Sequence, residues 1–229
     1  TPIHAARACS LCQDSQGAED LLNTWRQWLP LNDAPLQHEL ARLLLLMSEA
    51  DGAQALLEDL LRTNPADAEA TLSLASVYER MNRLDDAQAL VQSVIAAGFG
   101  STDPIGRDAD HVLAILMLRR GDAAAARVLL EQSGPRNACD PVHYLKLAEA
   151  YDKLDEPGLA LRALQLAHAL QVREMRITAP EGFLPDAPAL PATIIEVSAD
   201  SYRAWPKLDS LAARHSPVST VGVPRAGTT

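Results

Sequence analysis

The sequence is poor in aromatic side chains, cysteines and clustered positive charge, and each shortage narrows what the chain can be. Aromatic residues make up 4% of its 229 residues while alanine and leucine abound, which favours helices. The net charge is −10 and lysines and arginines form no run, so neither nucleic acid nor an anionic membrane is an expected partner. Apolar runs are too short to span a membrane and no signal peptide is visible, so we expect a cytoplasmic protein.

Cysteine is too sparse to predict a metal centre or a disulfide framework. Cys9 and Cys12 form a lone C-x-x-C pair, and Cys139 is far away in the sequence. A zinc site needs a second pair or two histidines at ligand spacing, and neither is nearby. On a helix the pair falls on one face, where small side chains pack. We therefore assign no metal, keep a redox role as the alternative, and expect a reducing compartment.

One pattern of apolar and small residues occurs four times. Ala75 follows Ala41 by 34 residues, and Ala148 follows Ala114 by 34. The step between the two middle alanines is 39 residues, which indicates an insertion of about five residues near Gly100–Gly106. In each copy the alanine follows a leucine and precedes a second apolar run with its own alanine. Those second alanines are Ala53, Ala87, Ala126 and Ala160.

The repeat resembles the tetratricopeptide repeat, a helix–turn–helix unit of the same period. Small residues are needed wherever the two helices of a unit approach closely, and stacked units bury a continuous core. The resemblance implies a mainly α protein, an α-solenoid with four units over residues 34–174. Residues 1–33 are expected to form a degenerate repeat or cap, with helices over Ile3–Leu11 and Ala18–Pro30. Trp25 and Trp28 there are expected to pack rather than to form a ligand cage.

The first helices of such units line the concave face of the array. That face is expected to carry seven polar residues, which lack the Lys/Asn pattern of repeats that clamp the C-terminus of a chaperone. One interpretation is a groove that binds a protein, a peptide or a second subunit. The other is a solvated surface of mixed charge. The seven residues are His38, Arg42, Ser76, Glu79, His111, Glu149 and Lys153.

The pattern changes after the repeats. Residues 175–192 are rich in proline, which indicates a linker, and residues 193–229 are expected to begin a second domain. Strand, helix and strand followed by a glycine loop is the opening of an α/β nucleotide-binding fold. We expect that domain to be incomplete at Thr229. The elements predicted in it are a strand at 193–197, short helices at 199–204 and 207–215, and a strand at 218–223.

A glycine-bounded loop closes the sequence. Glycines let backbone N–H groups face an anion, which suits a phosphate-bearing ligand. Thr228 stands where a P-loop kinase or ATPase needs its lysine, and the cation is Arg225 within the loop, so ATP or GTP hydrolysis is not expected. A structural turn after a strand is the alternative interpretation.

The same loop, Val221–Thr229, resembles the 5′-phosphosulfate loop of PAPS-dependent sulfotransferases, including bacterial ones with N-terminal tetratricopeptide repeats. The resemblance implies that Arg225 is catalytic, next to the sulfuryl group of PAPS. It implies that Ala226, Gly227, Thr228 and Thr229, with Arg225, hold the 5′-phosphate. Ala226 departs from the serine of that family, which removes one hydroxyl contact.

Two functions from different classes follow. The first is the N-terminal repeat region of a sulfotransferase that transfers a sulfuryl group from PAPS to an acceptor hydroxyl, joined to the opening strands of a truncated α/β P-loop domain. The residues expected to bind 3′-phosphate and to act as base are missing, so this chain alone is expected to be inactive. The second is a repeat module that binds other proteins and has no catalytic activity.

Overall fold

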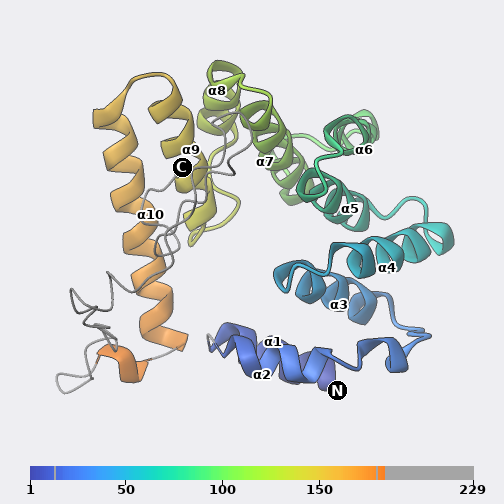
Figure 1. Cartoon of the computed structure of the whole chain (residues 1–229). Coiled ribbons are helices and arrows are strands. Elements are labelled where there is room, and N and C mark those ends of the chain that lie inside the picture. The colour runs from blue at the N-terminus through green and yellow to red at the C-terminus, as the bar shows by residue number, and fades with distance from the viewer. Residues whose placement is uncertain (13, 179, 184–229) are drawn as a thin grey trace, which may run out of the picture. The chain divides into compact units, whose positions relative to one another are not determined.

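Figure 1 shows the computed structural model of the chain. The structure describes residues 1–12, 14–178 and 180–183, which all lie within the unit formed by residues 1–187. This part of the chain is helical and contains no strand. Successive helices pair as hairpins, and each hairpin packs against the next. The helices of the four predicted units are α3 (Ala34–Leu46), α4 (Ala50–Thr63), α5 (Ala68–Arg80), α6 (Leu84–Ala96), α7 (Pro104–Arg119), α8 (Ala123–Ser133), α9 (Pro141–Lys153) and α10 (Pro157–Thr178).

The first helix of each unit begins at an aspartate. Asp33, Asp67, Asp103 and Asp140 are the N-caps of α3, α5, α7 and α9, and each carboxylate accepts a hydrogen bond from a backbone N–H in the first turn. The cap satisfies a donor that has no partner inside the helix and adds a negative charge at the positive end of the helix dipole. Three of the caps lie eight residues before the alanine of their repeat, and Asp103 lies eleven residues before Ala114 because α7 begins earlier.

The turn inside each unit has one residue with a positive φ. This residue is Ser48, Asn82, Gly121 or Asp155, at the same repeat position each time. The left-handed conformation ends the first helix and reverses the chain, and glycine or a short polar side chain adopts it most easily. In each predicted helix–turn–helix unit the first helix thus begins at an aspartate N-cap and ends near a residue with a positive φ.

The eight small residues of the repeat pattern are all buried between helices, as predicted. Because alanine ends at Cβ, two helix axes approach closely wherever alanines face each other, and leucine and valine side chains fill the space on either side. The larger core residues at one repeated position are Leu57, Val91 and Leu130. The buried alanines are Ala41, Ala53, Ala75, Ala87, Ala114, Ala126, Ala148 and Ala160.

The predicted insertion lies in the loop before α7 and in the helix itself, which has 16 residues where α3, α5 and α9 have 13. Asp103 accepts hydrogen bonds from the backbone N–H groups of Gly100 and Gly106. A Cβ at Gly106 would lie 1.9 Å from the carbonyl oxygen of Gly100. Glycine is therefore required where the inserted loop crosses the start of α7.

The N-terminal hairpin consists of α1 (Pro2–Leu11), α2 (Ser15–Leu22) and the 3₁₀-helix η1 (Trp25–Trp28). The second helix predicted over Ala18–Pro30 is thus broken after Leu22, and Trp25 reaches the core from the 3₁₀ turn. Trp25 is buried against Leu44 of α3, and Trp28 packs beside the same core. Both tryptophans therefore pack, as predicted.

At the other end, α10 continues to Thr178 and is followed by the short 3₁₀-helix η2 (Pro180–Phe183). The strands and helices predicted over residues 193–223, and the loop over Val221–Thr229, lie outside the described residues.

Candidate binding surfaces

The first helices of the repeats place six of the seven predicted residues on the surface of the array and one in its interior. His111 is 2% exposed, so its assignment to the concave face was wrong. His111 occupies the repeat position of Leu72, which is also buried. Its resemblance in position to His38 was misleading, because His38 stands at an edge of the core and is still partly exposed.

Polar contacts join the first helix of one repeat to that of the next. The ring of His38 lies 2.8 Å from the hydroxyl of Ser73. Arg7 of α1 lies 3.5 Å from Glu39 of α3, and Arg119 of α7 pairs with Glu79 of α5. These side chains therefore hold adjacent repeats in register as well as facing outward.

A hollow of about 390 Å³ lies among these contacts, between α1, α3 and the start of α5. His4 and Arg7 line it from α1, His38 and Glu39 from α3, and Glu69 from α5. Polar contacts cross the repeats here as well, since His38 Nδ1 is 3.4 Å from Glu69. Two of its three carboxylates are engaged within the array, because Glu39 pairs with Arg7 and Asp67 caps α5.

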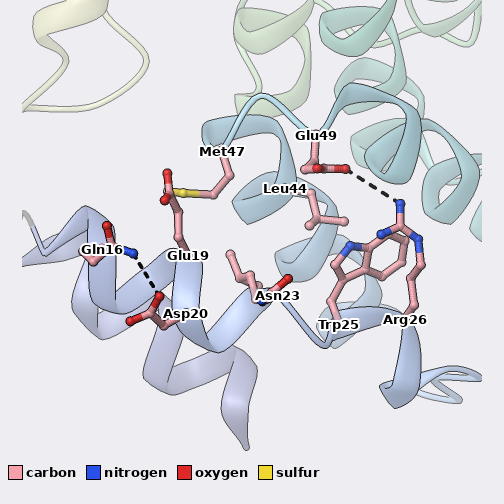
Figure 2. Close-up of a pocket in the computed structure, with 10 residues that line it drawn as sticks. Gln16, Glu19, Asp20, Asn23, Trp25, Arg26, Leu44, Met47 and Glu49 are labelled. Carbon is pink, nitrogen blue, oxygen red and sulfur yellow. Dashed lines mark hydrogen bonds and ion pairs between the residues drawn. The ribbon is translucent and has the colours of Figure 1, made fainter.

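A second hollow, of about 450 Å³, lies where α2 and η1 meet the turn between α3 and α4, and it has a clear electrostatic character (Figure 2). Its floor is apolar and is formed by the buried side chains of Leu22, Trp25 and Leu44. Three carboxylates surround that floor: Glu19 and Asp20 from α2, and Glu49 from the turn.

One cation accompanies the three carboxylates of this hollow. The guanidinium of Arg26 lies 4.6 Å from the centre of the Trp25 ring and 3.8 Å from Glu49. Gln16 donates a hydrogen bond to Asp20 and leaves its negative charge uncompensated. We name the site formed by Glu19, Asp20 and Glu49 around the Trp25–Leu44 floor the acidic hollow. Its net negative charge favours a cation with an apolar stem, such as lysine or arginine.

A buried polar cluster lies between α7 and α9, and the sequence pattern did not reveal it. Arg136 donates two side-chain hydrogen bonds and one backbone hydrogen bond to Asp140, which is 2% exposed. Burial opposes ionisation of Asp140, but the hydrogen bonds and charge of Arg136 outweigh it and hold the pKa of that carboxyl well below its usual range. Arg136, which is partly exposed, and the buried Asp140 therefore form an ion pair at the junction of two repeats.

Two histidines complete this cluster. The rings of His111 and His143 are both 2% exposed and their centres lie 5.6 Å apart. Nε2 of His111 is 3.9 Å from Asp140, and neither this nitrogen nor Nδ1 of His143 has a hydrogen-bond partner. Burial, aided by the charge of Arg136, lowers the pKa of His111 from 6.5 to about 4, and burial likewise lowers that of His143. Both rings are neutral at pH 7.

Basic residues near the ends of first helices cap the repeat before them. Arg80 donates to the carbonyl of Leu45, and Lys153 donates to the carbonyl of Leu118, in each case 35 residues earlier. A cation at the C-terminal end of a helix satisfies a free carbonyl and complements the dipole. Lys153, predicted for the concave face, thus has a role in stacking the repeats.

The remaining sequence predictions concern the cysteines, metal binding, membrane insertion and the PAPS loop. Cys9, Cys12 and Cys139 are free thiols, and Cys12 follows the last turn of α1. Within the described ranges, acidic, histidine and cysteine side chains nowhere gather in a group fit to hold a metal ion. None of the helices described is long and apolar enough to cross a membrane. The predicted PAPS contacts, Arg225, Ala226, Gly227, Thr228 and Thr229, lie outside the described residues.

Comparison with known proteins agrees with the helical repeats. Residues 44–104 match the sequence profile of the tetratricopeptide repeat family, whereas no curated protein sequence matches the chain. A thermophilic tetratricopeptide repeat protein of Thermus thermophilus has a similar structure, with a TM-score of 0.58 and 19% identity over 76% of this chain and 95% of that one. For Pseudomonas aeruginosa pilF the TM-score is 0.52, with 16% identity over 77% and 82% of the two chains. Residues 44–104 thus match the tetratricopeptide repeat family, and the helical hairpins on either side extend the same fold over most of the chain.

Proposed function

We propose that this chain is a protein-binding scaffold and that its acidic hollow receives a basic segment of the partner. The repeat fold supports the general role, because stacked helical hairpins offer extended surfaces for other proteins. The observation that carries the specific role is three carboxylates around an apolar floor, with one cation among them.

The chemistry of the hollow selects a lysine or an arginine on the partner. The methylene stem of either side chain lies against the part of Trp25 that remains accessible, while its charged end reaches Glu19 and Asp20 at the rim. Arg26 occupies the space between Trp25 and Glu49, so an incoming cation meets the α2 carboxylates first. An acidic partner is disfavoured by the charge of the rim and by the net charge of −10.

Peptide selection on the intact chain tests this role. Peptides selected from a random library should carry lysine or arginine, and the double variant Glu19→Gln/Asp20→Asn should bind them at least about tenfold more weakly, a loss of roughly 1.4 kcal/mol. The control is Asp59→Asn on α4, an exposed carboxylate outside the hollow, which should leave affinity unchanged. Selected peptides without basic residues, or equal affinity for both variants, would contradict the proposal.

A second candidate function, sulfuryl transfer from PAPS, rests on the loop sequence Val221–Thr229 and on the repeats that precede it. In this proposal Arg225 stabilises the charge that develops on the sulfuryl oxygens, as cationic groups do in phosphoryl transfer. In a longer protein that carries this sequence, Arg225→Ala should lower PAPS turnover by at least about a hundredfold. Unchanged turnover would remove the residue-level support for this function and leave the binding scaffold alone.

A further inference from the structure

The last repeat helix, α10, carries a stripe of large, exposed side chains. Leu161, Leu164, Val172 and Met175 are between 36% and 57% exposed. With His168 they recur at intervals of three and four residues, so all five lie on one side of the helix. We name these five residues the α10 stripe.

Comparison with the earlier repeats shows that this side of the helix normally lies against another helix. Leu164 stands at the position of Leu57, Val91 and Leu130, each of which is at most 1% exposed beneath the next repeat. In α10 the same position is 36% exposed. The α10 stripe therefore continues the stacking interface of the array.

Two more differences indicate that the stripe has a partner of its own. Leu161, 57% exposed, stands where the preceding repeats have Gln54, Gln88 and Arg127. Moreover, α10 has 22 residues, whereas α4, α6 and α8 have 14, 13 and 11. The added turns extend the stripe with Val172 and Met175, over about 21 Å from Leu161. An apolar patch lengthened in this way is typical of a protein interface.

We propose that the α10 stripe pairs with the α10 stripe of a second copy, as two antiparallel helices around a two-fold axis at His168. The spacing of the stripe is symmetric about this residue: Leu164 and Val172 are four residues away on either side, and Leu161 and Met175 are seven residues away. An antiparallel pair thus places Leu161 opposite Met175 of the second copy and Leu164 opposite Val172. Such self-complementarity is what a two-fold interface requires.

The absence of charge on the stripe and the polar surface of the N-terminal hairpin favour this arrangement. The alternative is a head-to-tail chain, in which the stripe of one copy packs on the N-terminal hairpin of the next. None of the five stripe positions holds an aspartate, glutamate, lysine or arginine, so pairing brings no like charges into direct opposition. The N-terminal hairpin instead exposes polar side chains, including His4, Arg7, Gln16, Glu19 and Asp20. An apolar stripe gains little by covering such a surface.

The dimer is expected to be weak. One pair of helices buries less than the roughly 800 Å² per partner of a standard interface, so we expect a dissociation constant in the micromolar range. Sedimentation equilibrium of the whole chain should show a monomer–dimer equilibrium. Leu164→Glu should shift it to monomer by at least about a hundredfold, because two carboxylates would lie in the interface, whereas His168→Leu should tighten it.

The matched control is Leu166→Glu, which changes an equally large and 52% exposed leucine on another side of α10. It should leave the dimer intact, and circular dichroism should show that all variants remain helical. A wild-type chain that is monomeric at every concentration overturns the proposal and assigns the stripe to a different occupant. So does a dimer that Leu166→Glu dissociates as strongly as Leu164→Glu, or one that Leu164→Glu leaves unchanged.

Discussion

Replacing Arg136 with alanine should lower the free energy of unfolding by about 3–5 kcal/mol. This is a large effect for a charged residue in the loop between two repeats. Its guanidinium donates to both carboxylate oxygens of Asp140, at 2.8 and 2.7 Å. Asp140 is 2% exposed, so in the variant its charge remains buried without a cation. The carboxylate would keep only backbone N–H donors, those of residue 136 and of His143.

The control for this prediction is Arg62→Ala, which removes an arginine–aspartate pair at the surface. Arg62 lies 2.6 Å from Asp59, but its side chain is 72% exposed and that of Asp59 is 53% exposed. Surface pairs contribute about 0–1 kcal/mol, because water solvates both partners when the pair is broken. Urea unfolding followed by circular dichroism gives both values. Equal losses for the two variants would show that Asp140 is solvated in the folded chain.

The repeats could be predicted from the sequence because their physical requirements recur at fixed spacing. Alanine at the closest approach of two helices, a larger apolar residue one turn later and a polar turn between helices give a period that is visible without coordinates. The first helices begin at aspartates for the same local reason each time, as Asp33, Asp67 and Asp140 show. Local rules of this kind extend over most of the described chain.

The candidate sites could not be predicted in the same way, because they depend on departures from the repeat. The acidic hollow exists because α2 ends at Leu22 and a 3₁₀ turn carries Trp25 to the core, where one continuous helix was expected. The Arg136–Asp140 pair joins a loop residue to a helix cap, and no periodicity specifies that contact. The burial of His111 was not specified by the repeat either, since the same position holds the buried Leu72 and the partly exposed His38.

The same histidine leads to the second prediction, that the chain loses stability steeply between about pH 6.5 and pH 4. In the unfolded chain His111 binds a proton near pH 6.5, whereas burial in the fold lowers its pKa to about 4. Between these values the unfolded state binds more protons, so stability is full above pH 6.5 and falls as the pH is lowered. The shift corresponds to about 3 kcal/mol at pH 4. His143 acts in the same direction, while Asp140 stays ionised through this range because Arg136 lowers its pKa.

His111→Leu should remove most of this pH dependence, because it places the residue of the second repeat, Leu72, at the equivalent position of the third. Leucine needs no hydrogen bond there, whereas His111 leaves Nε2 without one. Urea unfolding at a series of pH values from 7 to 4 should give a flatter curve for His111→Leu than for the wild type. His4→Leu changes an exposed histidine of α1 and should keep the wild-type curve. If His111→Leu loses stability toward pH 4 as steeply as the wild type, the acid sensitivity arises elsewhere, and His111 is accessible to protons without disruption of the α7–α9 junction.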